Sequence, residues 1–508
     1  MFTADKEVES LRALVGARFP VYQVNVRGDA VAFYVTVNPA TLDADFEALR
    51  LEVIPKAYIP FLTKEQGEHI LYVQRRPPRQ FWSSRVNAVL LVITVLTTMY
   101  AGALNWAGYE GRVSLDGDAV LKGTLFFALP LLLILGLHET GHYIVARRYR
   151  VSASLPFFIP SIPPLGTFGA MISMRDPIPT RRALMDIGAS GPLLGLAVAI
   201  PVTVAGLLLT GADPRSLGPN VGGRLGFEPP FLFSFLSLFF PIPPGTAYHP
   251  TLFAGWVGIF VTAMNLLPAG QLDGGHVARA LLGDRARYAS YAAVLLMFFL
   301  SFAYPGWAII ALFIVLLGLR HPPPLNDLVP LDGRRLAVGL VTSIVLVASF
   351  VPVPISEIPI NPDLEFRGIG PAGNTTDTVA LTAPRGAFTN ATFAVANTGN
   401  VELNVTLTLV NVETLRSYNW SVDLTAAYWG SNTSHPQALL ANGTTFSFNS
   451  SEHVLVHLSL FVPSDAPLNG TYGFSLHARV QAVIGSTRYD IPGSDLDVPD
   501  LLVRVSVV

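Results

Sequence analysis

Long apolar runs occupy the middle of the chain, whereas both ends alternate between apolar and polar positions. A membrane-spanning helix needs about 20 apolar residues, because each residue adds about 1.5 Å across a hydrocarbon core of roughly 30 Å. Seven runs come near this length: residues 86–106, 122–146, 184–209, 250–268, 287–304, 307–320 and 336–354. An eighth run, 231–240, is too short to span, is bracketed by prolines, and is expected in the membrane interface. The pattern predicts a mainly α-helical polytopic membrane domain over residues 86–355, with about seven transmembrane helices.

The two ends of the chain read as smaller soluble domains. Residues 1–80 combine a helical apolar pattern with an alternating stretch around a Gly28-Asp29 turn, which predicts an α+β domain. Residues 358–508 hold short Val, Leu, Thr and Phe runs between Asn, Gly, Pro and Ser clusters, a pattern typical of an all-β sandwich. The stretch Asn397–Asn400 followed by Leu403–Leu407 resembles archaeal-type immunoglobulin-like modules of cell-surface proteins, and this resemblance implies a fold without an activity.

The composition is apolar and poor in charge. Of the 508 residues 51% are hydrophobic and 13% are charged, against about 25% charged in soluble chains, so a water-soluble enzyme is excluded. The 33 basic and 35 acidic residues give a net charge of -2, so no overall positive field favours a nucleic-acid partner. The absence of cysteine excludes disulfides, thiolate metal ligands and cysteine nucleophiles, so any metal must be held by His, Asp or Glu.

All the arginine clusters beside the apolar runs fall on the same predicted side, and positive flanks stay in the cytoplasm. This places the N-terminus inside and, after seven spans, the C-terminus outside the cell membrane. The first ten residues lack the features of a signal peptide, which agrees with an N-terminus that is not exported. All Asn-x-Ser/Thr sequons follow the last apolar run, as expected for an exported C-terminal region: Asn374, Asn390, Asn404, Asn419, Asn432, Asn442, Asn449 and Asn469.

The second apolar run contains His138-Glu139-Thr140-Gly141-His142. On a helix the two histidines, at positions i and i+4, lie on one face, where two imidazoles can bind Zn²⁺ while Glu139 takes a proton from water. The alternative is a set of polar side chains satisfied by hydrogen bonds between helices. Ionisable residues within a membrane are costly and are functional by default, which favours the metal site.

Two histidines leave a catalytic zinc one protein ligand short, because such sites typically have three plus water. Asp273, in Leu272-Asp273-Gly274-Gly275-His276, follows the fourth run at the same predicted membrane face as the histidines. Taken alone, this motif is typical of a turn or a helix cap. Combined with the histidine motif it predicts a third ligand. His276 remains a rival ligand or a group that supports the ligands.

Both motifs together resemble the site-2 protease family of intramembrane zinc metalloproteases, peptidase family M50. Three wider stretches, residues 164–170, 186–192 and 265–276, resemble its archaeal, cyanobacterial and plastid branch. The resemblance covers roughly residues 86–330. It implies that His138, His142 and Asp273 bind one zinc per chain and that Glu139 is the general base. It also implies that Asn265 holds the substrate or the developing oxyanion.

The segment after the second run, residues 151–174, is rich in Pro, Gly and aromatic residues. The family resemblance implies a membrane-embedded hairpin or loop here. We expect Gly166, Thr167, Phe168 and Gly169 to offer an edge strand to an unwound substrate; an ordinary cytoplasmic loop is the alternative. Gly191-Pro192 and Gly195 in the third run permit either close helix packing or a kink.

The expected function is hydrolysis of transmembrane protein substrates within the lipid bilayer, near its cytoplasmic face, as in regulated intramembrane proteolysis. A substrate helix must unwind first, because its backbone is hidden in internal hydrogen bonds. Two other classes remain open: a membrane metal transporter or sensor that uses the same ligands, and an inactive scaffold that presents the outer β domain to an extracytoplasmic partner.

Overall fold

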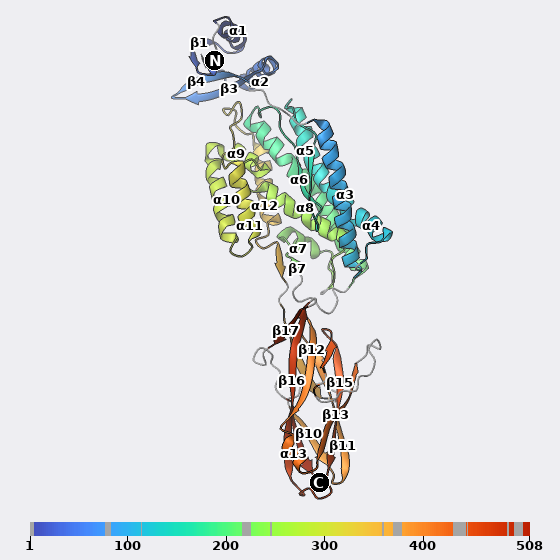
Figure 1. The fold of residues 1–508 in the computed structure, drawn as a ribbon. Helices are drawn as coiled ribbons and strands as arrows, with labels where there is room; N and C mark the ends of the chain where they lie inside the picture. The colour runs from blue at the N-terminus through green and yellow to red at the C-terminus, as the bar shows by residue number, and fades with distance from the viewer. Residues whose placement is uncertain are drawn as a thin grey trace. The chain divides into compact units, whose positions relative to one another are not determined.

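The structure, a computed structural model, describes residues 5–76, 83–112, 114–215, 225–243, 246–357, 360–368, 378–429, 443, 445–484, 487–491 and 501–508. The chain divides into two compact units, Met1–Arg215 with Glu228–Pro354, and Ser216–Phe227 with Ile355–Val508 (Figure 1). Some features noted in the sequence lie outside the described residues. They are the domain limits predicted at residues 80 and 358, and the sequons at Asn374, Asn432 and Asn442.

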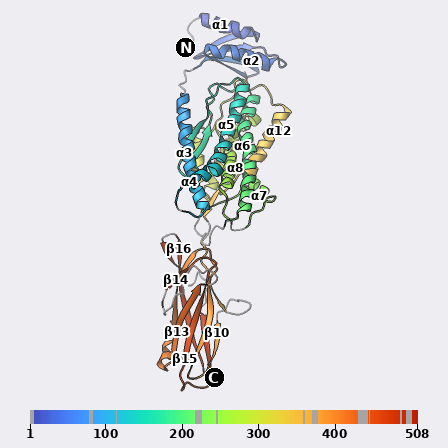
Figure 2. The same ribbon diagram turned by 90° about the vertical axis from the view of Figure 1, so that its right-hand side faces the viewer.

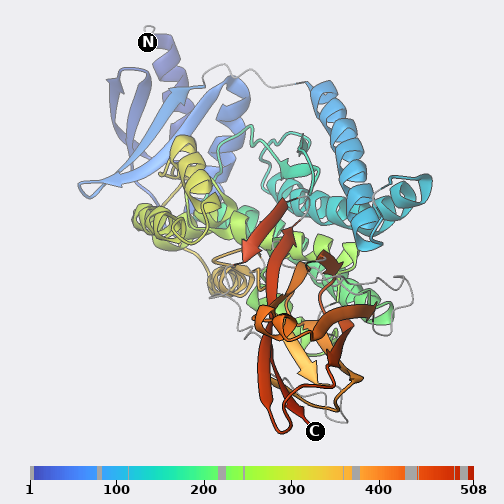
Figure 3. The same cartoon turned by 60° about the horizontal axis from the view of Figure 1, so that its bottom comes forward.

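The first unit begins with a small α+β fold, which Figure 3 shows in blue. Two helices, α1 (Asp5–Gly16) and α2 (Leu42–Val53), accompany an antiparallel sheet of order β1-β2-β4-β3. Its strands are β1 (Val21–Arg27), β2 (Ala30–Val35), β3 (Tyr58–Glu65) and β4 (Glu68–Arg75). Helices and sheet share one apolar core, as the alternating sequence pattern predicts.

A later segment of the chain completes this core. Leu325 and Val329 lie between the sixth and seventh predicted spans, and both are buried in the core formed by this sheet and its helices. The backbone N–H of Leu62 in β3 donates to the carbonyl of Leu325 at 2.8 Å. The segment around Leu325 therefore ties the N-terminal fold to the helical region.

Among the described residues, three helices are long and apolar enough to cross a membrane: α3 (Ser84–Tyr109), the continuous helix Gly117–Arg148, and α6 (Arg181–Ala212). The second of these consists of α4 (Gly117–Gly123), a π-helical turn at Thr124–Ala128, and α5 (Leu129–Arg148). Figures 1 and 2 both show α5, α6 and the shorter α8 (Pro250–Leu266) lying side by side. The helical, apolar middle of the predicted fold class is confirmed.

The other predicted spans also form helices, but each is shorter than its apolar run. They are α8, α10 (Ala286–Leu300), α11 (Gly306–Leu317) and α12 (Gly333–Ser349). Backbone breakers explain the difference: α8 ends just before Pro268, and α11 ends at Gly318, whose φ is +100°. The run 231–240 forms the short helix α7 (Phe231–Ser237), and α9 (Asp273–Leu282) follows α8.

Close contact between α5 and α6 depends on glycine. A Cβ atom on Gly141 of α5 would lie 2.7 Å from the carbonyl oxygen of Ser190 in α6. Small residues allow helix backbones to approach this closely inside a membrane. Two interpretations of Gly191-Pro192 were open, close helix packing and a kink. The contact with Gly141 supports close packing.

The second unit is rich in β structure, and its described strands share a large apolar core. One sheet has the order β10-β18-β16-β12-β14 with β17 beside β16, and the other has the order β13-β15-β11-β9. Strand β15 alternates strictly between buried and half-buried positions, as a strand covered on one face does. The main strands are β9 (Leu364–Gly368), β10 (Thr378–Ala383), β11 (Ala387–Asn397), β12 (Glu402–Val410), β13 (Ser421–Trp429), β14 (Thr445–Phe448), β15 (His453–Val462), β16 (Thr471–Ile484), β17 (Thr487–Ile491) and β18 (Leu501–Val507). The predicted β-rich C-terminal region is confirmed.

Candidate metal centre

Helix α5 carries His138, Glu139 and His142 in its middle, where its other residues are largely apolar. All three side chains are buried, with 3%, 4% and 6% of their surface exposed. Their potential ligand atoms lie within 4.8 Å of one another. The helical spacing of four residues places the two imidazoles together, as expected from the sequence.

Two further helices bring polar groups to the same point. Asp273 is the first residue of α9, and its Oδ2 lies 3.2 Å from the Nε2 atoms of both His138 and His142. Asn265, near the end of α8, places its Nδ2 atom 3.3 Å from Nε2 of His138. Residues 127 to 135 positions apart in the sequence thus meet at one site.

The three donor atoms have the spacing that a tetrahedral zinc ion requires. The two Nε2 atoms lie 3.2 Å apart, which equals their distances from Oδ2 of Asp273. Zinc ligands at about 2.0–2.1 Å in tetrahedral geometry are roughly 3.3–3.4 Å from one another. Glu139 Oε1 stands 3.9 Å from Nε2 of His138, beside this triangle. The geometry leaves Glu139 available for proton transfer.

A hydrogen bond orients the ring of His142. Its Nδ1 atom lies 2.8 Å from the carbonyl oxygen of Ile187 in α6, so Nδ1–H donates there and Nε2 keeps its lone pair for a metal. His276, the rival ligand, turns elsewhere: its Nδ1 atom lies 3.0 Å from the carbonyl of Leu272, and its ring packs edge-on against His321.

Glycines of α6 make room for both imidazoles. A Cβ atom on Gly191 would lie 2.1 Å from Nε2 of His142, and one on Gly195 would lie 3.1 Å from Nδ1 of His138. Sequence reasoning noted these glycines but did not connect them with the histidines. Their spacing of four residues on one helix face was the available signal. They are part of the site because a side chain at either position would press on a histidine ring, most severely at Gly191.

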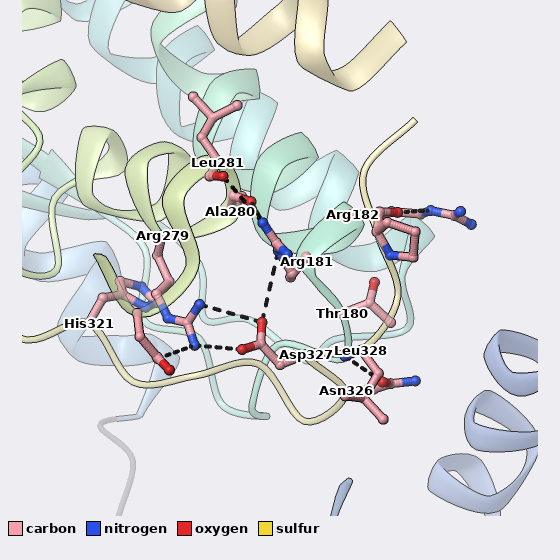
Figure 4. Close-up of polar contacts among 12 residues, drawn as sticks. Thr180, Arg181, Arg182, Arg279, Ala280, Leu281, His321, Asn326, Asp327 and Leu328 are labelled. Carbon is pink, nitrogen blue, oxygen red and sulfur yellow. Dashed lines mark hydrogen bonds and ion pairs between the residues drawn. The ribbon is translucent and has the colours of Figure 1, made fainter. Parts of the chain in front are cut away.

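Arginine side chains fix α9, and thereby Asp273, to the rest of the unit. Figure 4 shows Arg181, at the start of α6, reaching the carbonyl oxygens at the end of α9, with 2.7 Å to Ala280. Arg279 of α9 is buried and pairs with Asp327 at 2.9 Å and with Asp284 at 3.1 Å. Sequence reasoning used both arginines only to orient the chain. Asp327 lies 48 positions from Arg279 and Ala280 lies 99 positions from Arg181, too far away to be found from the sequence. Asp284, five positions from Arg279, is the near partner.

The segment with the expected substrate strand forms a two-stranded antiparallel hairpin of β5 (Phe157–Pro160) and β6 (Thr167–Met171). Thr167 is buried and Phe168 is 78% exposed. Within the described residues, β6 has β5 as its sole ladder partner, so its other edge is unpaired there. Gly166 lies before the strand, where its carbonyl accepts a hydrogen bond of 2.7 Å from Thr97 Oγ1 of α3.

Comparison with known proteins agrees with this geometry. The family model for peptidase family M50 matches residues 126–304, which include all five residues at the centre. This part of the chain is similar to peptidase family M50. A probable chloroplastic zinc metalloprotease of Arabidopsis thaliana, EGY1, is 32% identical over 243 residues, covering 44% of this chain and 43% of the relative. Its Arabidopsis relative EGY2, also a probable chloroplastic zinc metalloprotease, is 27% identical over 47% of this chain and 44% of the relative.

The chain spans less than half the length of these curated relatives. The M50 match covers residues 126–304, so α3, α11, α12 and both ends of the chain lie outside it. A solved cohesin of the Acetivibrio cellulolyticus scaffoldin B is 9% identical, covers 29% of this chain and 99% of the cohesin chain, and has a TM-score of 0.18. At that score the likeness carries no argument.

Proposed function

We propose that the chain is an intramembrane zinc metalloprotease that hydrolyses transmembrane proteins near the cytoplasmic face of the membrane. The supporting observation is the meeting of two imidazole nitrogens and one carboxylate oxygen, each 3.2 Å from the others, beside a buried glutamate. The match of residues 126–304 to the model of family M50 and the likeness to probable zinc metalloproteases agree with this chemistry.

His138, His142 and Asp273 would hold one zinc ion. When bound, zinc lowers the pKa of a water molecule and polarises a peptide carbonyl, so both nucleophile and electrophile are activated. Glu139 acts as the general base: its carboxylate takes a proton from the attacking water and returns it to the nitrogen of the leaving amine. Nδ2 of Asn265 donates a hydrogen bond to the carbonyl oxygen of the substrate, where negative charge develops.

The free edge of β6 would receive the substrate. A peptide bond inside a helix is shielded by its own hydrogen bonds, so the substrate must become extended before it is cut. An unpaired strand edge supplies backbone partners to an extended peptide. Thr167, Phe168 and Gly169 would make this contact, with Gly166 anchoring the turn before the strand on α3.

We also propose that α8, α10, α11 and α12 complete seven spans, with the N-terminal fold in the cytoplasm and the C-terminal domain outside. That domain would be an immunoglobulin-like sandwich that binds an extracytoplasmic partner, which a pull-down with residues 358–508 would test. The absence of cysteine makes the topology testable, because a single introduced cysteine has no background. In intact cells an impermeant maleimide should label Tyr418→Cys and should leave Glu9→Cys unlabelled until the membrane is opened.

Hydrolysis of a fused transmembrane reporter tests the proposed activity. Glu139→Gln should abolish cleavage while zinc, measured per chain, stays bound, because Glu139 is outside the ligand triangle. Glu9→Gln, an exposed glutamate of α1, is the matched control and should cleave normally. Removal of zinc by a chelator should stop cleavage, and added zinc should restore it.

Normal cleavage by Glu139→Gln would show that the assigned base is wrong. Two results together would instead identify a metal transporter. The wild type would cleave no reporter, and it would carry metal into vesicles at a rate that Glu139→Gln leaves unchanged.

A further inference from the structure

A polar cavity of about 290 Å³ lies beside α9, and none of the residues that line it is one of the proposed metal ligands. Its walls come from α9, the first turns of α10 and the segment that follows α11. The volume is close to the lower end of the roughly 300–1,000 Å³ that ligand sites usually have. The polar side chains that line it are Arg279, Asp284, Arg287, Ser290, Arg320 and His321.

Three guanidinium groups and one carboxylate line this cavity. The buried Arg279 is held by Asp327 and Asp284, so it forms a fixed wall, as Figure 4 shows for Asp327. Arg287 and Arg320 are exposed. Among the described residues neither makes an ion pair. Arg287 donates a hydrogen bond of 2.9 Å to the hydroxyl of the neighbouring Tyr288. Two positive charges are therefore available to an anionic ligand.

The inner wall adds neutral hydrogen-bonding groups. Ser290 is buried, and its hydroxyl has only a long contact of 3.4 Å with the carbonyl of Ala286, so it can turn toward a ligand. The ring of His321 is partly buried and packs against His276. Burial lowers the pKa of His321 to about 3, and the ring is thus neutral near pH 7. Its Nδ1–H donates to the carbonyl of Pro322 at 2.6 Å, so the ring shapes the wall and offers no donor to a ligand. The two guanidinium charges and the Ser290 hydroxyl remain as donors, as in sites for phosphate oxygens.

The helices above the cavity present an apolar surface. Exposed side chains line both α10 and α11, and exposed Tyr288 and Tyr291 lie on α10 at the end nearest the cavity. Tyrosines at this level are typical of a membrane–water interface. The exposed apolar residues of the two helices include Leu295, Leu296, Phe299, Ile309, Phe313 and Leu316. A ligand in the cavity would thus lie where lipid headgroups meet the helices.

We propose that this cavity binds the phosphate of an anionic membrane lipid, whose acyl chains lie along the apolar surface of α10 and α11. Basic pockets between membrane helices on the cytoplasmic side are suited to such headgroups. Arg287 and Arg320 pair with the phosphate, and Ser290 donates to it. The inference depends on the proposed placement of α10 and α11 in the membrane and not on the protease activity.

Native mass spectrometry of the full chain in detergent tests this proposal. The wild type should bind phosphatidylglycerol more tightly than phosphatidylcholine. The double variant Arg287→Gln/Arg320→Gln should lose about tenfold to thirtyfold in affinity, since each basic residue near an anionic surface contributes about 1 kcal/mol. Arg287→Lys/Arg320→Lys should retain most of the affinity, because it keeps both charges.

The matched control is Arg148→Gln/Arg285→Gln, which removes two exposed arginines that do not line the cavity. An equal loss in this control would show general attraction to basic charge and would overturn the proposal. Binding of inorganic phosphate that competes fully with the lipid would overturn the lipid as the source. Glu139→Gln should bind phosphatidylglycerol as the wild type does, so failure of the protease proposal can be told apart from failure of this one.

Discussion

Replacing Gly191 by alanine should displace a predicted zinc ligand without changing any ligand residue. The added Cβ atom would lie 2.1 Å from Nε2 of His142 and 2.6 Å from Cε1 of the same ring. Ordinary contact begins near 3.4 Å, so the ring or the helix must move by about 1.3 Å. Metal–ligand distances tolerate only about 0.2 Å. His142 therefore cannot bind zinc in the variant unless α5 and α6 separate.

Separation of the two helices is resisted by their close contact at the neighbouring residues, Gly141 and Ser190. Gly141 of α5 already approaches the carbonyl of Ser190 so closely that a Cβ atom would be 2.7 Å from it. Extra atoms forced into such an interface cost about 1–3 kcal/mol. We expect the zinc affinity of Gly191→Ala to fall by at least about 100-fold, the upper end of what altered support of a ligand costs.

A graded series separates this effect from a general loss of stability. The clearances are 2.1 Å at Gly191, 3.1 Å at Gly195 and 4.0 Å at Gly136, the last against Phe158. Zinc affinity measured by chelator competition should fall most for Gly191→Ala, less for Gly195→Ala and not at all for Gly136→Ala, which is on α5 itself. Wild-type zinc affinity in Gly191→Ala, or a loss in Gly136→Ala as large, would refute the reasoning.

Three other variants test the surroundings of the site and the two ends of the chain. Asp327→Asn leaves the buried Arg279 with one exposed partner. The variant should lose about 1–3 kcal/mol of stability, seen as a lower thermal unfolding midpoint, and should cleave the reporter less. An unchanged midpoint would contradict the role of this pair. Hydrogen bonds from Arg75 and Tyr58 hold the pKa of Glu7 below its ordinary value of 4.5. The stabilisation of the fold is present above that pH and is lost as the pH falls through the lowered pKa. Glu7→Gln should therefore be less stable than the wild type near pH 7 and equal to it in acid. Asn404, the first residue of its sequon, is 3% exposed, whereas Asn390 is exposed. In a glycosylating host, glycopeptide mass spectrometry should find Asn404 unmodified and Asn390 modified. Modification of Asn404 in folded protein would contradict its burial.

The sequence alone determined the helical middle, the β-rich C-terminal region and the residue types available for a metal. Apolar runs and alternating runs report secondary structure because burial in lipid or in a core imposes a fixed period on neighbouring residues. The motif from His138 to His142 was readable for the same reason, since one turn of helix brings both imidazoles to one face.

The helix lengths and the full set of residues around the metal centre were decided only by the tertiary structure. Gly318 ends α11 inside an apolar run that hydropathy alone would extend. Which apolar residues are buried against other helices depends on the packing. Asp273 reaches the histidines only because α9 packs against α6, where Arg181 holds the last carbonyls of α9. The clearance that Gly191 gives to His142 likewise exists only once α5 and α6 are in contact. Contacts between residues far apart in the chain leave no local period in the sequence, and for this reason only the folded structure shows them.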